Sequence, residues 1–360
     1  MLYTVKYGDT LCSVAEAHNM STAELSALNQ IDPHIKPVVG QSLIVSDDSK
    51  RSRTLIIHGS AMPGVGDMAL MCAAPYLSYI SISSAMMLSD GALTFPNDNT
   101  LLLRARACKA TPLLKIVCRK DHIGNTPLHS LIQNKAAMQT LYGNIVKYIS
   151  AKNYRGINFD AEGLHSENTD ELSLLLTNLG TALKENGFIF AVTLPWDMPA
   201  LTDIAGADMA IISACGRDTP YGPPLPLSPV DEMEKAIECA LCAIPADKLL
   251  MELPTFGRNW SLPYRGGIPR TVYLCEAPAL AYNHFADIRY DHGTQAPHFS
   301  YYDSAGTEHM VWFHDPRSLT VRLALAEKHN LGGVSWGNIA PFYRPGWIVL
   351  GGMYGAKRAL

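Results

Sequence analysis

The chain has 360 residues, of which 48% are hydrophobic and 17% are charged, and its net charge is −4. This length suffices for one large domain and a small one, and the balance of charge gives no basic patch that would indicate nucleic acid as a partner. No apolar run reaches the roughly 18 residues of a membrane-spanning helix, and the N-terminal residues lack the pattern of a secretory signal. We therefore expect synthesis in the cytoplasm and no membrane span.

Cysteine and histidine residues give no sign of a metal or cofactor site. The eight cysteines are scattered through apolar segments, which indicates a reducing compartment. Cys239 and Cys242 share one helix face and are interpreted as two buried thiols. We interpret several scattered histidines without ligand spacing as surface or structural residues, namely His58, His284, His292 and His309. No cofactor is expected.

Residues 1–47 are predicted to form a small unit with the order strand, helix, helix, strand. The first strand lies near residues 3–5, and Ser21 with Glu24 forms a capping box at the start of the second helix. A closing strand is predicted at residues 40–45.

The turn and loop sequences of this unit resemble those of a LysM module. The pattern Tyr-Thr-Val-x-x-Gly-Asp-Thr-Leu stands at its start, and Val-Gly-Gln-Ser-Leu stands near its end. LysM modules bind chains of N-acetylglucosamine, as in peptidoglycan and chitin. The resemblance implies a glycan-binding groove lined by Gly8, Asp9, Thr10, Leu11, Ile31, Asp32 and Pro33. Gly8 and Asp9 are also expected to serve as turn and cap residues, and the two roles are compatible.

Residues 48–53 are polar and charged, so we predict a linker, and residues 54–360 then alternate between strands and helices. Strands are predicted at 55–59, 77–83, 112–117, 156–162, 188–194, 209–213, 249–254 and 333–336. Helical patterns lie at 137–150, 169–186, 229–244 and 318–329. This alternation favours an α/β fold, a (β/α)8 TIM barrel. A doubly wound sheet is the alternative, but no glycine-rich nucleotide loop follows any strand.

One interval, about 258–317, breaks the alternation with strand and turn character. The turn at 304–306 stands between two aromatic runs and predicts a hairpin. We therefore predict a small α+β insertion before the last strand of the barrel.

The segment 156–162 carries the most informative pattern. Its apolar residues alternate with Asn158, Asp160 and Glu162, so the two acids share one face of a strand. An ordinary strand with one wet face could show this pattern. However, helical patterns on both sides indicate a buried parallel strand, and the acids stand at its C-terminal end, where such barrels place their active sites.

This segment resembles the fourth-strand signature of family 18 glycoside hydrolases, Asp-Gly-x-Asp-x-Asp-x-Glu. Arg155 replaces the first Asp, and Asn158 stands where Asp or Asn occurs. The segments 249–257 and 332–336 also match the family in order. A LysM unit followed by this barrel resembles spore cortex-fragment lytic N-acetylglucosaminidases, which act on peptidoglycan. The resemblance therefore implies peptidoglycan or another N-acetylglucosamine glycan as partner, and association with the spore.

The resemblance also implies roles for these residues. Glu162 would protonate the glycosidic bond and later activate water, while Asp160 would orient the substrate's N-acetyl group, which acts as the nucleophile. Asn158 would support Asp160 by a hydrogen bond. The reaction would be metal-free and would retain the anomeric configuration. We expect Trp336 to form the floor under the reacting sugar, the alternative being a residue of the barrel core.

The chain departs from the family where a tyrosine usually holds the acetamide oxygen after the sixth strand. Cys215 stands at the matching position, and a thiol is a weaker donor than a phenol. Tyr221 is a candidate substitute. Two hypotheses follow, a working N-acetylglucosaminidase and a glycan-binding protein whose barrel no longer turns over its ligand.

Overall fold

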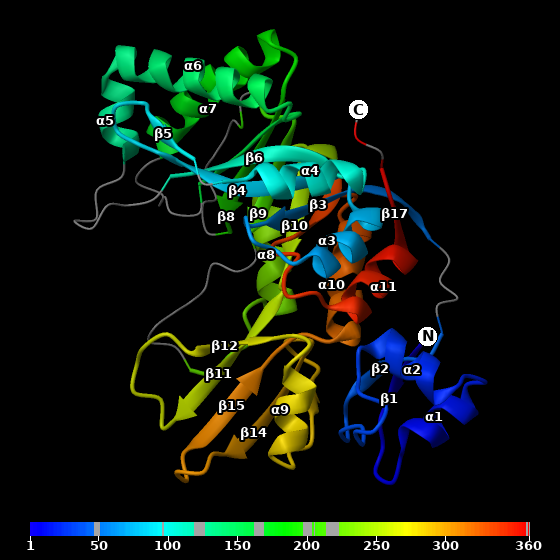
Figure 1. The fold of residues 1–360 in the computed structure, drawn as a ribbon. Coiled ribbons are helices and arrows are strands. Elements are labelled where there is room, and N and C mark those ends of the chain that lie inside the picture. Colours follow the sequence, from blue (N-terminus) through cyan, green and yellow to red (C-terminus); the bar gives the residue numbers. More distant parts are fainter. Residues whose placement is uncertain are drawn as a thin grey trace.

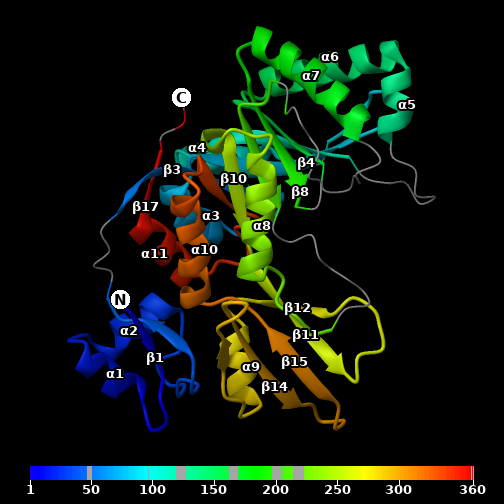
Figure 2. The same cartoon turned by 180° about the vertical axis from the view of Figure 1, so that it is seen from behind.

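The computed structural model describes residues 1–46, 51–95, 97–118, 127–161, 169–196, 204, 206–213, 223–357 and 359. The large domain is built on a closed barrel of eight parallel strands (Figures 1 and 2). The barrel strands are β3 (Arg53–Ala61), β4 (Tyr79–Met87), β6 (Thr111–Val117), β7 (Gly156–Asp160), β8 (Ile189–Pro195), β9 (Met209–Ser213), β10 (Leu249–Leu253) and β16 (Gly333–Trp336). Neighbours in this order pair with each other, and β16 pairs with β3 to close the ring. The predicted barrel is confirmed, and every predicted strand overlaps one of these.

Helices cover the outside of the barrel (Figures 1 and 2). They are α3 (Asp67–Ala73), α4 (Asn99–Ala107), α5 (Pro127–Gln133), α6 (Lys135–Ala151), α7 (Thr169–Glu185), α8 (Val230–Leu241), α10 (Pro316–Lys328) and α11 (Arg344–Met353), with short 3-10 turns at Ala74–Tyr76 and Ala246–Lys248. Two short strands extend the sheet, β5 (Leu93–Thr94) beside β4 and β17 (Tyr354–Ala356) beside β3. The four predicted helical patterns fall on α6, α7, α8 and α10.

The interior of the ring changes from apolar to polar along the strands. A buried apolar cluster lies where the strands begin, formed by Tyr79, Leu113, Ala191, Met209, Ile211 and Leu250. Two residues further along three of these strands, on the same inward face, stand Ser81, Lys115 and Thr193. Polar side chains therefore gather toward the C-terminal ends of the strands, the end at which barrels of this type place their sites.

The predicted insertion is a five-stranded antiparallel sheet with one helix, and it follows β10 directly (Figure 1). Its elements are β11 (Phe256–Leu262), β12 (Arg270–Tyr273), α9 (Ala277–Asn283), β13 (Arg289–Asp291), β14 (Ala296–Tyr302) and β15 (Glu308–Trp312). The expected hairpin joins β14 to β15, where the Asp303 N–H donates to the Thr307 carbonyl at 3.0 Å.

The N-terminal unit has the predicted order, with β1 (Leu2–Thr4), α1 (Leu11–Ala17), α2 (Thr22–Asn29) and β2 (Ser42–Ile44). The strands pair antiparallel, and the helices cover a small core of their own. The capping box of α2 is present, because the Glu24 N–H donates to the Ser21 hydroxyl at 3.2 Å and the Ser21 N–H donates to the Glu24 carboxylate at 2.8 Å.

This unit is docked against the barrel beside α11 in both views (Figures 1 and 2). The Ile288 N–H donates to the Val39 carbonyl at 2.9 Å, and Arg317 donates to the Gly40 carbonyl at 2.9 Å. Gly40 has φ +82°, and a Cβ there would lie 1.7 Å from the Ile288 carbonyl oxygen, so only glycine fits this contact. Of the predicted linker, residues 48–50 lie outside the described part, and β3 already begins at Arg53.

Candidate functional site

Strand β7 sends its two described polar side chains into the barrel, as its alternation predicts. Ile157 and Phe159 are fully buried in the outer core between strands and helices. Asn158, also fully buried, donates from its amide nitrogen to the Ser81 hydroxyl at 3.1 Å, and its amide oxygen accepts from the Thr193 hydroxyl at 3.0 Å. Ser81 belongs to β4, which is not a neighbour of β7, so these side chains meet only across the interior.

Asp160 lies at the end of β7, two residues beyond Asn158 on the same face. Its carboxylate forms an ion pair with Lys115 of the neighbouring strand β6, with 2.9 Å between Oδ2 and Nζ. The side chains of Lys115 and Asp160 are only 15% and 9% exposed. Lys115 is thus a partner of Asp160 that sequence reasoning missed, and the inward periodicity of β6 was the signal available for it. The support of Asp160 by Asn158 stays a prediction.

His58 of β3 also lies among the polar side chains of the barrel interior. Its ring nitrogens lie 2.8 Å from the Ser335 hydroxyl and 2.7 Å from the Ser81 hydroxyl. Burial, with a smaller contribution from the positive charge of Lys115, lowers the pKa of His58 to about 3, so the ring is neutral at physiological pH. His58 is therefore a buried, neutral residue of the barrel interior and not a surface residue.

Glu162, Cys215 and Tyr221 lie outside the described residues. Their predicted roles, as the acid and as the groups that would hold the acetamide, remain predictions from the sequence.

Trp336 is placed in the barrel wall rather than in an open pocket. Its side chain is 1% exposed and stacks on Trp347 of α11, with 4.8 Å between ring centroids. It lies on the same face of β16 as Val334, opposite to Ser335, whose hydroxyl meets His58 in the interior. These contacts agree with the alternative interpretation, in which Trp336 is a residue of the barrel core. At 1% exposure its ring has no face accessible to a sugar.

The predicted glycan-binding residues of the N-terminal unit fall into two groups. Leu11 is 4% exposed and belongs to the core of the unit, which corrects its expected place in the groove, and Thr10 caps α1 by accepting from the Ser13 N–H. Asp9 accepts hydrogen bonds from the Lys6 N–H at 2.7 Å and the Tyr3 hydroxyl at 2.8 Å, which lower its pKa.

The second group follows α2. Ile31 and Asp32 line a cavity of about 100 Å³ between the N-terminal unit and the barrel, together with Tyr282 of α9 and Tyr343. Pro33, next along the loop, is exposed, and Gly8 has φ +89° in the turn before α1. The structure thus places the loop after α2 at the boundary of the two domains.

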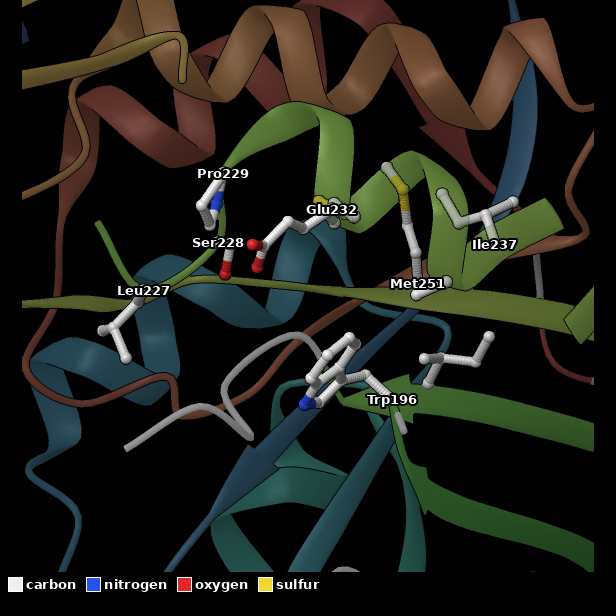
Figure 3. Close-up of a pocket in the computed structure, with 10 residues that line it drawn as sticks. Trp196, Leu227, Ser228, Pro229, Glu232, Ile237 and Met251 are labelled. Atoms are coloured by element: carbon white, nitrogen blue, oxygen red, sulfur yellow. The ribbon is translucent and has the colours of Figure 1, made fainter. Parts of the chain in front are cut away.

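A second small cavity, of about 30 Å³, lies outside the barrel wall under the start of α8 (Figure 3). Trp196, which follows β8, lines it with Ile212, Glu232 and Met251. Ile212 and Met251 belong to the outer core, so this space is separate from the interior that holds Asp160.

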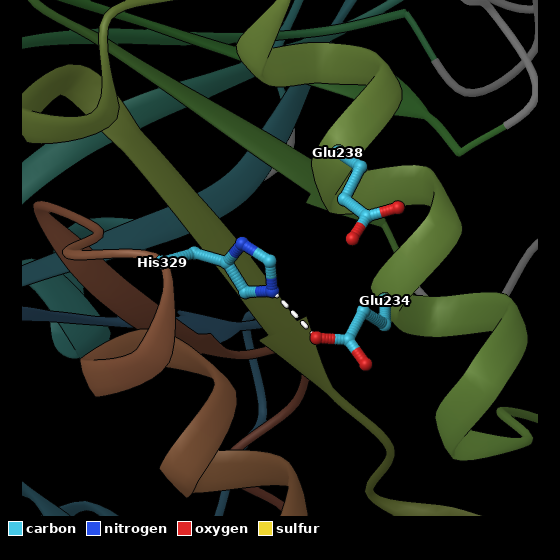
Figure 4. Close-up of side chains that lie close together, drawn as sticks. All are labelled: Glu234, Glu238 and His329. Carbon is cyan, nitrogen blue, oxygen red and sulfur yellow. Dashed lines mark hydrogen bonds and ion pairs between the residues drawn. The ribbon is translucent and has the colours of Figure 1, made fainter.

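Glu234, Glu238 and His329 bring potential metal-ligating atoms within 4.8 Å of one another between α8 and α10 (Figure 4). Glu234 accepts from His329 Nε2 at 2.7 Å and pairs with Lys328 at 2.5 Å, and these contacts lower its pKa. Because Lys328 already balances the charge of Glu234, we interpret the cluster as an ion-pair network between two helices.

Cys239 of α8 is half-buried, and Cys242, which follows the end of α8, is exposed. The prediction of two buried thiols was therefore wrong.

The closed barrel, the inward acid at the end of its fourth strand and the docked N-terminal unit agree with the comparisons to known proteins. The model of glycosyl hydrolases family 18 matches residues 54–338, and the LysM domain model matches residues 3–46. The chain therefore belongs to glycosyl hydrolases family 18 and is a glycosidase with an N-terminal LysM domain. Within the described ranges, the structure has no helix long and apolar enough to cross a membrane.

Particular relatives extend over most of the chain. It is 28% identical to the cortical fragment-lytic enzyme of Bacillus anthracis over 294 residues, which cover 77% of this chain and 68% of that protein. It is 27% identical to the cortical fragment-lytic enzyme of Bacillus subtilis over 419 residues, with 97% of each chain covered. The structure of the Bacillus cereus spore cortex-lytic enzyme SleL has a TM-score of 0.88 at 23% identity, covering 99% of both chains, and this likeness supports the fold.

Proposed function

We propose that this protein is a retaining N-acetylglucosaminidase that cleaves peptidoglycan of the spore cortex or its fragments. The observation that carries the proposal is the inward carboxylate of Asp160 at the C-terminal end of β7, in a family 18 barrel fused to a LysM domain. The names of the relatives from Bacillus species support the spore cortex as the source of substrate. Association with the spore follows from the same likeness.

The mechanism that we propose uses the substrate's own N-acetyl group as the nucleophile. Glu162 donates a proton to the leaving oxygen, and the acetamide oxygen attacks the anomeric carbon from the other face. Asp160 orients the acetamide N–H and stabilises the positive charge of the oxazolinium intermediate. Glu162 then takes a proton from water, which opens the intermediate, so two inversions retain the configuration.

The LysM domain would hold the glycan near the barrel. Asp9 and the loop containing Ile31 and Asp32 are the proposed contacts. The domain is held to the insertion by the hydrogen bond of Val39 and to α10 of the barrel by that of Gly40. A bound glycan strand would therefore meet the barrel in a restricted set of orientations, which raises its effective concentration at the site.

The second candidate is a glycan-binding protein with little or no turnover. Cys215 in the place of the usual tyrosine and the burial of Trp336 favour it, because both remove expected contacts to the reacting sugar.

Incubation with cortex muropeptides or chitooligosaccharides, followed by mass spectrometry, separates the two candidates. The enzyme releases N-acetylglucosamine-containing products that a Glu162→Gln variant does not release, and proton NMR of the first products shows the retained anomer. Binding of the same glycans without release above the Glu162→Gln control would leave only the binding protein.

A further inference from the structure

The barrel interior contains a lysine beside the carboxylate that the proposed mechanism uses. Lys115 stands on β6, which pairs in parallel with β7 so that Lys115 lies opposite Asn158 and Val117 opposite Asp160. Leu113, two residues earlier, belongs to the inner apolar cluster, so Lys115 also points into the ring. Its ammonium reaches toward the C-terminal end and meets Asp160 at 2.9 Å.

A lysine in this position is costly unless its charge is used. Its side chain is 15% exposed, and burial of an ammonium is tolerated only with a partner that compensates its charge. The ion pair supplies this compensation and at the same time restrains the Asp160 carboxylate by one of its oxygens. A hydrocarbon side chain of similar length would fill the space without holding the carboxylate.

Two described neighbours of this ion pair, His58 and Asn158, carry no positive charge. His58 is held between two hydroxyls with a pKa of about 3 and is neutral. The amide of Asn158 makes its hydrogen bonds to Ser81 and Thr193.

We propose that Lys115 is a positioning residue of the reaction, whose ammonium fixes the orientation of the Asp160 carboxylate that receives the substrate's acetamide. This inference rests on the proposed function. Orientation by Lys115 acts from strand β6, on a different side of the Asp160 carboxylate from the residues of its own strand β7. The orientation of the Asp160 carboxylate matters most once the acetamide has begun to attack, because only then does Asp160 face a developing positive charge.

The test compares Lys115→Met, Lys115→Arg and a matched control, Lys248→Met, in the full chain. Lys248 is a part-buried lysine just before β10, at the opposite end of the barrel, where it donates to the Ala207 carbonyl at 3.1 Å. For Lys115→Met we expect kcat on muropeptides to fall roughly tenfold or more with KM changed much less, because a misplaced group costs mainly in the transition state. Lys115→Arg should recover part of this loss, and Lys248→Met should keep wild-type kcat.

Calorimetry with a thiazoline that mimics the oxazolinium intermediate gives a readout independent of turnover. We expect Lys115→Met to bind the thiazoline roughly tenfold more weakly than wild type and to bind N-acetylglucosamine, the product, equally well. Circular dichroism confirms that each compared variant is folded. Wild-type kcat and thiazoline affinity in folded Lys115→Met would overturn the role of Lys115 alone. A wild-type protein that neither cleaves muropeptides nor binds the thiazoline would overturn the proposed function, and the role of Lys115 with it.

Discussion

The buried imidazole of His58 makes the stability of the barrel depend on pH in a calculable way. In the folded chain its pKa is about 3, because the ring lies in the barrel interior between Ser81 and Ser335 and near Lys115, whereas an exposed histidine has the ordinary value of 6.5. Between these two values only the unfolded chain binds the proton. The stability contributed by the neutral ring is therefore fully present above pH 6.5 and is lost progressively as the pH falls toward 3.

The magnitude follows from linkage, at about 1.4 kcal/mol for each pH unit in this window. Between pH 7.5 and pH 5.0, His58 should therefore cost about 2 kcal/mol of unfolding free energy. For a barrel of roughly 300 residues, with an unfolding entropy of about 0.6 kcal/mol/K, this corresponds to a decrease of about 3 °C in Tm. His314, which is fully buried and whose pKa burial also lowers, should add a second contribution of the same sign.

The assay is thermal unfolding from pH 5.0 to 7.5, followed by circular dichroism, for wild type and His58→Gln. Glutamine can bond to the same two hydroxyls but does not titrate, so the variant should lose about 2 kcal/mol less than wild type over this range, whatever its stability at pH 7.5. His314 remains in both proteins and cancels in the comparison. Parallel pH dependences for the two proteins would refute the assignment of His58 as a neutral, buried ring.

Three further predictions concern catalysis, folding and the domain contact. Asp160→Asn should reduce kcat/KM on muropeptides by roughly 100-fold or more, since it removes the charge that faces the intermediate, and activity within threefold of wild type would contradict this role. Arg322→Met should lower the free energy of unfolding in urea by about 3 kcal/mol. The reason is that the fully buried guanidinium donates to carbonyls that include Gln295 at 2.8 Å and Ser318 at 3.0 Å. A loss below about 1 kcal/mol would argue against this stabilising role of Arg322. Gly40→Ala should release the LysM domain from the barrel, seen as faster proteolysis near residue 50 and slower digestion of insoluble sacculi, while cleavage of small muropeptides stays at the wild-type rate. Equal digestion of sacculi would show that docking does not matter.

The sequence by itself determined the fold and the elements that carry the site. Period-two and helical patterns located every barrel strand, and Ser21 with Glu24 located a helix start, because these signals are local and repeat along the chain. The alternation around Asn158 and Asp160 was also sufficient to predict that both side chains point to the same side, since the pleat of a strand fixes this geometry.

Only the tertiary structure decided which side chains meet. Lys115 and Asp160 are far apart in the sequence, and their contact depends on the register of β6 against β7, which no local pattern specifies. The surroundings of Trp336 also depend on the tertiary structure. A motif predicted that its ring lies under a sugar, whereas its stacking on Trp347 depends on how α11 packs outside the barrel. Closure of the ring and docking of the first domain join segments distant in the chain, and such contacts depend on the fold as a whole.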